Sequence, residues 1–225
     1  VSDVETAPSN LSVSWSSNVD GPLGQSSVNT DSSVLLAISQ LSLGPHTITL
    51  LAQDDAGASC EDSIDFIVNT VPTTPTVSLS PNNPDTTMDI IAQSSGSTDA
   101  DGDTVSYLYD WEINGRTANV TTDTFPSNLT VKGDQLTVTV TPNDGISNGI
   151  PSQSSTTIVN APPVIQNHLL SHNTAVVGDT VTCSANISDS DTIDILSTSY
   201  TWSNGATGST YTIQSSDTVN STLSC

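Results

Sequence analysis

The sequence has almost no basic residues. Its 225 residues contain two Lys or Arg against 24 Asp or Glu, so the formal net charge is −22. A field of this sign repels phosphate backbones and anionic lipid, which excludes nucleic-acid binding from the expected functions and attracts cations. Nearly all of the acids are Asp, and short carboxylates suit tight loops and hard cations better than helix faces.

Signals for catalysis and for membrane insertion are also missing. No run of 18 apolar residues occurs, so we expect no membrane-spanning segment here. His46, His168 and His172 do not have the spacing of zinc ligands, and the chain has neither a nucleophile elbow nor a Gly-rich phosphate loop. We therefore expect that the protein is not an enzyme.

Strand patterns fill the chain, and no convincing amphipathic helix is present. Leu11, Val13 and Trp15 alternate with serines, as the residues of a half-buried strand do. Turn signals such as Asn114-Gly115 and Asn204-Gly205 separate these runs. The pattern predicts an all-β fold.

One pattern occurs three times: an acidic loop followed by a strand that ends in Trp. The tryptophans are Trp15, Trp111 and Trp202, which lie 96 and 91 residues apart. A period near 90 residues with one Trp per period predicts tandem immunoglobulin-like β-sandwich domains with Greek-key connections. We expect the three Trp side chains to pack in the cores.

Two similar proline-rich linkers divide the repeats. Residues 66–69 (FIVN) run into TVPTTP, and residues 157–160 (TIVN) run into APP. The linkers predict a first repeat at residues 1–70, a middle repeat at 71–160 and a third repeat at 161–225. Because proline favours extended, semi-rigid connections, we expect a rod-like array.

Only the middle repeat is expected to be a complete sandwich. The first repeat lacks strands A and B, and the third is truncated in strand F, its penultimate strand. Half a sandwich cannot bury its core, so either the polypeptide continues in both directions or other copies supply the missing strands, as in fibres built by strand donation.

The cysteines indicate an oxidising compartment. Cys183, Trp202 and Cys225 follow the Cys…Trp…Cys order of an immunoglobulin-like sandwich, which predicts a disulfide between Cys183 and Cys225. Cys60 either pairs with a residue upstream of Val1 or is free.

The acidic loops suggest calcium. In such sandwiches the B–C and F–G loops lie at the same end, so Asp99, Asp101 and Asp103 should converge with Asp144 beside a proline-rich linker. Calcium takes six to eight oxygen ligands from flexible loops, and Gly102 permits a tight turn between them. The same reasoning marks further acids in the flanking repeats: Asp3, Glu5, Asp54, Asp55, Asp189 and Asp191. The alternative is that these are ordinary solvated turns, because Asp is a common turn residue.

Five Asn-x-Ser/Thr sequons are candidate N-glycosylation sites: Asn10, Asn119, Asn128, Asn186 and Asn220. In a chain so rich in Asn, Ser and Thr, about this number also arises by chance.

Two segments resemble a known family of repeats. They are STDADGDTVSY at residues 97–107 and LGPHTITLLAQDDAG at residues 43–57. Both are similar to segments of the PKD and related Ig-like repeats of large prokaryotic surface proteins. The chain departs from the PKD signature at Trp111, which Glu112-Ile113-Asn114-Gly115 follow. The resemblance implies an Ig-like fold and an extracellular setting as spacer, adhesive stalk, fibre component or accessory module.

These observations predict a structural repeat module of a long acidic extracellular or cell-surface protein or fibre. It would act as a stalk, spacer or filament-forming element, stiffened by Ca²⁺ and glycosylated, with adjacent repeats or neighbouring copies as partners. The alternative is a carbohydrate- or protein-binding adhesin module, or an accessory domain of a secreted enzyme. That alternative calls for exposed aromatics on one face, and aromatics are only 4% of the chain.

Overall fold

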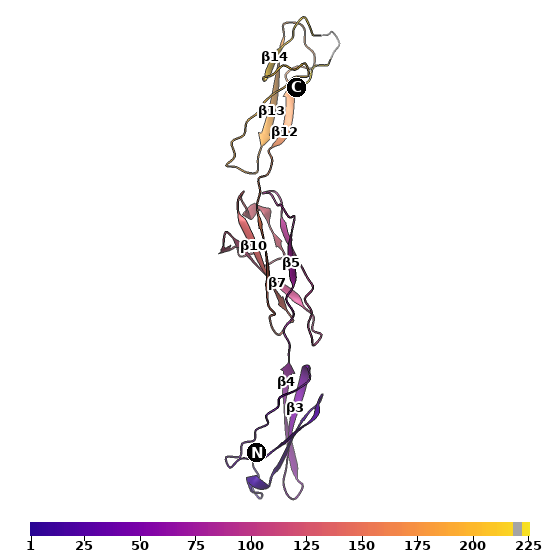
Figure 1. The fold of residues 1–225 in the computed structure, drawn as a ribbon, viewed down its shortest axis with the longest axis vertical. Coiled ribbons are helices and arrows are strands. Elements are labelled where there is room, and N and C mark those ends of the chain that lie inside the picture. The colour runs from indigo at the N-terminus through magenta and orange to yellow at the C-terminus, as the bar shows by residue number, and fades with distance from the viewer. Residues whose placement is uncertain (218–221) are drawn as a thin grey trace. The chain divides into compact units, whose positions relative to one another are not determined.

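A computed structural model describes residues 1–217 and 222–225 and shows an all-β chain (Figure 1). Strands make up 43% of it and helices 3%, which confirms the predicted class. The elements of the described residues, in chain order, are η1 (Pro8–Asn10), β1 (Ser12–Ser17), β2 (Gly21–Ser26), β3 (Gly44–Gln53), β4 (Ser59–Val68), β5 (Thr76–Ser80), β6 (Ile90–Ser95), β7 (Ser106–Ile113), β8 (Arg116–Thr117), β9 (Thr124–Phe125), η2 (Ser127–Leu129), β10 (Gln135–Asn143), β11 (Ser152–Thr157), β12 (Val164–Leu170), β13 (Thr180–Ser188) and β14 (Thr210–Thr212).

The chain forms two compact units. Unit 1 comprises Val1–Thr76, Ser94–Leu108 and Val140–Ser152, and unit 2 comprises Val77–Gln93, Tyr109–Thr139 and Gln153–Cys225. Strands β7 and β10 contribute residues to both units. The three-repeat division inferred from the sequence stays a prediction.

The strands form four sheets with the orders β2-β1-β3-β4, β5-β6-β9, β11-β10-β7-β8 and β12-β13-β14. The chain leaves one sheet after β6 to enter another at β7, and it returns between β8 and β9. Such changes of sheet are typical of β-sandwiches. The second strand of the middle repeat, β6, begins at Ile90.

The core of the middle repeat follows the alternation read from the sequence. Leu136, Val138 and Val140 on β10 are completely buried, and the residues between them are partly exposed. In unit 2 the Trp111 and Phe125 rings are also fully buried, with centroids 5.2 Å apart. Tilted aromatic pairs at this separation add to the stability gained from burial.

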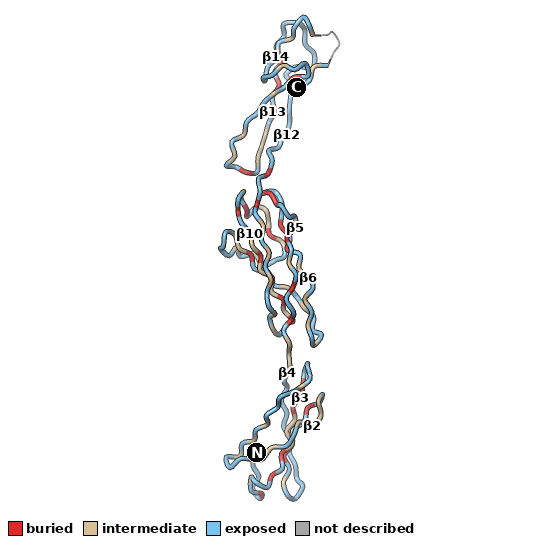
Figure 2. Tube along the Cα trace, in the orientation of Figure 1, coloured by how far each residue is buried: buried red, intermediate tan, exposed pale blue. Residues whose placement is uncertain are grey.

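The sheet of the first repeat is covered less completely. Val13 and Ala52 are buried with Leu11 and Val28, but Trp15 is only partly buried against them, contrary to the expected core position. Figure 2 shows β4 as largely exposed. In β4, Phe66 lies opposite His46 of β3 in the strand register, and Phe66 is 53% exposed.

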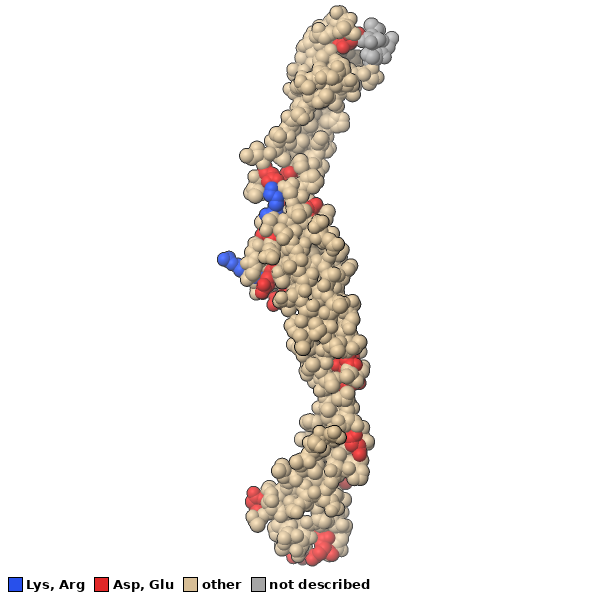
Figure 3. Space-filling model, viewed as in Figure 1, with Lys and Arg blue, Asp and Glu red and all other residues tan. Residues whose placement is uncertain are grey.

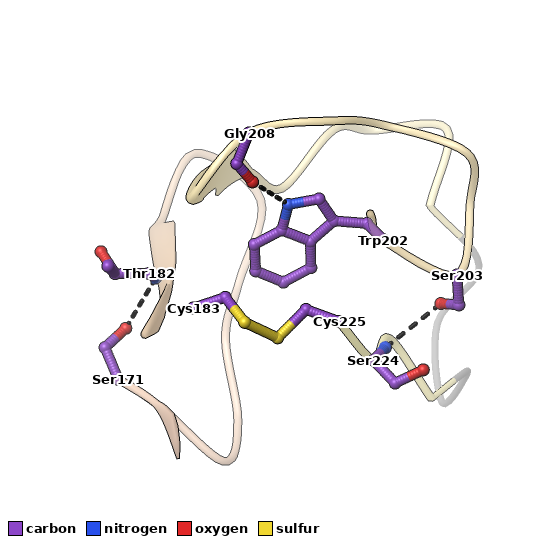
Figure 4. The surroundings of a disulfide bond; sticks show 8 residues. All are labelled: Ser171, Thr182, Cys183, Trp202, Ser203, Gly208, Ser224 and Cys225. Atoms are coloured by element: carbon purple, nitrogen blue, oxygen red, sulfur yellow. Dashed lines mark hydrogen bonds between the residues drawn. A yellow bond between two sulfur atoms is a disulfide. The ribbon is translucent and has the colours of Figure 1, made fainter. Parts of the chain in front are cut away.

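The third repeat packs around its disulfide. Cys183 on β13 is bonded to Cys225, and both lie beside Trp202 (Figure 4). The Trp202 indole donates to the carbonyl of Gly208 at 2.9 Å. The prediction of a strand that ends at Trp202 is wrong for the described residues, in which the segment around Trp202 forms only an isolated bridge, Thr201 to Thr207. A strand needs a ladder of partners, and the turn at Gly205 ends the pairing after one bridge.

Candidate cation site at the linkers

Three carboxylates converge in the loop ahead of β7. Oxygen atoms of Asp99, Asp101 and Asp103 all lie within 4.8 Å of one another. Gly102 turns the loop between them with a φ of +88°, a conformation that L side chains rarely adopt. The Asp101 amide donates to Oδ1 of Asp99 at 3.0 Å, which holds the start of the loop in place.

The same loop binds the linker that follows β4, which we call the first joint (residues 69–75). The amide of Thr70 donates to Oδ2 of Asp101 at 3.0 Å, and its hydroxyl donates to Oδ1 at 3.2 Å. All of these residues belong to unit 1. Asp101 therefore accepts a hydrogen bond from the linker backbone and also belongs to the group of three carboxylates.

Asp144 reaches the first joint but does not join the group of three carboxylates. Its Oδ1 accepts from the amides of Ile146 and Ser147, and its Oδ2 accepts from the amide of the Asn69 side chain at 3.0 Å. The Ser147 amide first, and then the Asn69 side chain, lower the pKa of Asp144 below its ordinary value of 3.8. Asp144 is thus held at the first joint by protein partners, and it lies outside the group of three carboxylates.

Two oxygens at the first joint are buried without a hydrogen bond. They are Oδ1 of Asn69 and Oδ2 of Asp99. Burying a polar oxygen without a partner is costly, and carboxylate and amide oxygens are ligands that Ca²⁺ prefers. The group of Asp99, Asp101 and Asp103, with the unpaired Oδ2 of Asp99, therefore fits a hard cation.

A second joint, residues 160–163, repeats the arrangement in unit 2. The Ala161 amide donates to Oδ2 of Asp191 at 2.8 Å, and the Asp191 amide donates to Oδ1 of Asp189 at 2.7 Å. Asp191 is 4% exposed and also accepts from the Thr86 hydroxyl. We call the shared pattern the Asp clasp: a linker amide bound by the second Asp of an Asp-x-Asp loop.

A lysine completes the second joint. Lys132 donates to Oδ1 of Asn160 at 2.8 Å and also to Oδ1 of Asp194. The hydrogen bond to Asp194 is the main cause that raises the Lys132 pKa above 10.5, and Asp191 and Asp189 add to it. Acidic side chains gather in small groups on the visible surface, and one basic group lies directly beside such a group (Figure 3).

The other predicted acids stay in ordinary turns. Oδ1 of Asp3 accepts from the Glu5 and Thr6 amides, which lower the Asp3 pKa, while Glu5 is exposed. Asp54 accepts from the Ala58 amide, and Asp55 accepts weakly from the Thr6 hydroxyl at 3.4 Å. No metal-type group forms from these four acids in the described residues.

The remaining sequence candidates that the structure describes lie at the surface. Asn10, Asn119, Asn128 and Asn186 are exposed, and Asn220 lies outside the described residues. Cys60 is an exposed free cysteine.

Sequence reasoning missed the two Asn residues and Lys132. The available signal was the Val-Asn pair that precedes each proline-rich linker, at residues 68–69 and 159–160.

An apolar groove opens in the third repeat, within unit 2. It has a volume of about 710 Å³, and its lining includes Ile165, Cys183, Ile187, Leu196 and Tyr200. Its lining comes from β12, from β13 and from the segment of residues 194–201.

No protein-family model matches the chain, and no curated protein matches it either. Several solved structures do resemble it. They include fibronectin(III)-like modules of CbhA from Clostridium thermocellum (TM-score 0.37, 17% identity, 71% of this chain and 82% of that chain). Three N-terminal domains of the highly immunogenic outer capsid protein of bacteriophage RB49 have a TM-score of 0.30 and 19% identity, over 90% of this chain and 67% of that chain. A tetra-tandem repeat from the extending region of a large adhesion protein has a TM-score of 0.29 and 17% identity, over 97% of this chain and 62% of that chain.

These likenesses are distant, and at such scores they say nothing about what this chain binds. The all-β class rests on the strands and sheets of the chain itself. PKD-like ancestry and a prokaryotic source stay predictions. Within residues 1–217 and 222–225, no helix has the length and apolar character that crossing a membrane requires.

Proposed function

We propose that this chain is a run of non-catalytic β-sandwich repeats from a long acidic extracellular or surface protein or fibre. The repeats serve as a stalk, spacer or filament-forming element. Adjacent repeats or neighbouring copies are their partners, and the exposed sequons carry glycans where the host glycosylates secreted proteins.

The observation that carries this proposal is the repeated Asp clasp. Asp101 binds the amide of Thr70 at 3.0 Å, and Asp191 binds the amide of Ala161 at 2.8 Å, in both cases through Oδ2. Each clasp ties a linker to the acidic loop of the sandwich that follows it in the chain. A chain that forms the same contacts at successive linkers is suited to keeping neighbouring repeats in a fixed orientation. This is a mechanical function.

Calcium is the proposed cofactor of the first joint. Asp99, Asp101 and Asp103 would hold the ion, and the buried Oδ2 of Asp99 has no hydrogen bond in the described residues that would compete with it. A bound Ca²⁺ would neutralise the carboxylates and cross-link the loop ahead of β7, so the linker that this loop clasps would become stiffer. Binding to the folded state alone also raises the unfolding temperature.

The test is thermal unfolding of the full chain in millimolar Ca²⁺ and then in chelator. We expect a higher midpoint in Ca²⁺ and no Ca²⁺ response in the variant Asp103→Asn. Asp103 is exposed and is not the receptor of the linker amide, so this variant removes a ligand charge and leaves the clasp intact. Asp110→Asn is the matched control: it makes the same change at an exposed position of β7, and it should respond to Ca²⁺ like the wild type.

Identical midpoints in Ca²⁺ and chelator would refute the calcium part of the proposal. The mechanical part has a separate test. Small-angle scattering of the full chain should give an elongated particle, and variants that break both clasps should show a wider range of interdomain arrangements. A compact particle in the wild type would contradict a stalk or spacer.

A further inference from the structure

Each joint contains an asparagine, Asn69 or Asn160, whose side-chain amide makes the same hydrogen bond. The two asparagines differ in the partner of the side-chain oxygen. Nδ2 of Asn69 donates to the carbonyl of Thr70 at 2.7 Å, and Nδ2 of Asn160 donates to the carbonyl of Ala161 at 2.6 Å. In both joints the next residue donates its amide to the second Asp of the clasp. The side-chain oxygen of each Asn is then left for another partner.

The joints differ in what that oxygen meets. Oδ1 of Asn160 accepts a hydrogen bond from the ammonium of Lys132, whereas Oδ1 of Asn69 is buried with no partner. Oδ2 of Asp99 is unpaired as well. The second joint thus has a positive charge at the place where the first joint has unsatisfied oxygens.

The acids around the two positions correspond. Asp99 and Asp101 match Asp189 and Asp191 through the same amide-to-carboxylate bond. Asp103 joins the first pair in a group of three carboxylates. Asp194 lies beside the second pair and binds Lys132, but Asp189, Asp191 and Asp194 do not form such a group in the described residues. Lys132 pairs with Asp194 and lies in the field of the other two.

Few basic side chains are available to neutralise the acids of a joint. The chain has only two, and the second is Arg116 on β8. A free cation is therefore the natural counter-ion of the first joint, where oxygen ligands are already gathered.

We propose that Lys132 is the built-in cation of the second joint, where its ammonium takes the role that a bound Ca²⁺ takes at the first joint. This inference rests on the proposed calcium site. It assigns metal dependence to one linker only: the first joint responds to Ca²⁺, and the second is closed without it. Asp189 and Asp191, which the sequence marked as calcium ligands, serve Lys132 and the clasp instead.

The experiment uses the full chain and two readouts. Calorimetric titration with CaCl₂ at physiological ionic strength counts the sites. Amide hydrogen exchange, followed by NMR, reports separately on Thr70 and Ala161, which donate the clasp hydrogen bonds. The variants are Lys132→Met, which removes the charge and keeps the length of the side chain, and Lys132→Arg, which keeps the charge.

In the wild type we expect about one Ca²⁺ per chain, with Ca²⁺ slowing exchange at Thr70 and leaving Ala161 unchanged. In Lys132→Met we expect about two Ca²⁺ per chain and a Ca²⁺ effect at both amides, because the vacated acids can now take the ion. Lys132→Arg should behave like the wild type. Adding Asp103→Asn to Lys132→Met should leave the site at Ala161 and abolish the one at Thr70.

Protection of Ala161 by Ca²⁺ in the wild type would overturn the inference, because the second joint would then bind metal despite Lys132. So would a Lys132→Met variant whose stoichiometry and Ala161 exchange match the wild type. If the wild type binds no Ca²⁺ but Lys132→Met gains a site at Ala161, the first-joint proposal fails and the role of Lys132 stands.

Discussion

Ala161 donates its amide hydrogen to Oδ2 of Asp191 across 2.8 Å, and both residues are buried. The residues lie 30 positions apart in the sequence, so the bond closes a long loop at the place where a linker meets the sandwich after it. Because neither group can turn to water instead, this contact should contribute to stability more than most loop hydrogen bonds do.

Replacing Asp191 by Ala should lower the free energy of unfolding. The change leaves the Ala161 amide buried and unpaired and also removes the acceptor of the Thr86 hydroxyl. We expect a loss of about 1–3 kcal/mol, measured by urea unfolding. Ser190→Ala, at the exposed neighbouring position, is the control and should change stability little. Equal stability of the two variants would mean that the clasp is only incidental.

The core of the middle repeat offers a matched pair of leucines. Leu136 on β10 is fully buried, whereas Leu108 on β7 is 50% exposed. We expect Leu136→Ala to destabilise the fold by about 2–5 kcal/mol because it loses apolar burial and leaves a cavity. The same change at Leu108 should cost less than about 0.5 kcal/mol. Chemical denaturation measures both, and similar losses would place Leu108 inside the core.

The free energy of unfolding should fall at low pH, in part because Asp144 becomes protonated. Hydrogen bonds from Ser147 and Asn69 lower its pKa in the folded state below 3.8. A carboxylate with a lowered folded pKa contributes stability that is fully present above the unfolded value of 3.8 and disappears as the pH falls through the folded pKa. Thermal melts between pH 6 and pH 2, in roughly half-unit steps, should therefore show a smaller acid loss for Asp144→Asn than for the wild type.

Asp3 and Asp89 have lowered pKa values for the same kind of reason, so some acid loss should persist in the Asp144 variant. Asp110→Asn is a suitable control for removing one charge. A variant whose stability follows the wild-type curve at every pH would show that Asp144 is not held in its charged form by these bonds.

The cysteines should differ sharply in reactivity. Cys60 is exposed and free, whereas Cys183 is buried and bonded to Cys225. Alkylation of the native protein, read by mass spectrometry, should add one label, at Cys60; reduction under denaturing conditions should raise this to three. Because the disulfide closes a separation of 42 residues, removing it should cost about 2–5 kcal/mol.

Reduction should also change the fluorescence of Trp202, since this ring packs against Cys183. The variant Trp202→Phe is the control that assigns the signal among the three Trp residues. Native labelling at Cys225 would contradict the bonded pair.

The strands were the part of this fold that the sequence pattern predicted best. On β10 the alternation of Leu136, Val138 and Val140 with polar residues is both the sequence signal and the reason for burial on one face. The third Trp strand was predicted by the same logic and failed. Period-two patterning around Trp202 is present, but a strand forms only where another strand supplies a ladder, and there the described residues supply a single bridge.

The candidate site was accessible only in part. The spacing of Asp99, Asp101 and Asp103 around Gly102 is local, so it could be read directly from the loop. Asp144 looked like a further ligand because it is acidic and lies at the same end of the sandwich. In the structure it lies outside the group of three carboxylates and binds nearby amides and Asn69, a placement that residue type alone does not reveal.

The sequence by itself determined the all-β class and the place of the acidic loops, because each depends on neighbours a few residues apart. Only the tertiary structure decided which acids lie together and which hydrogen-bond partners each of them has. Lys132 meets Asp194 from 62 residues away, and Thr70 meets Asp101 from 31 residues away. Charge complementarity acts through space, so the difference between a joint with its own cation and one with unpaired oxygens became visible only once the chain was folded.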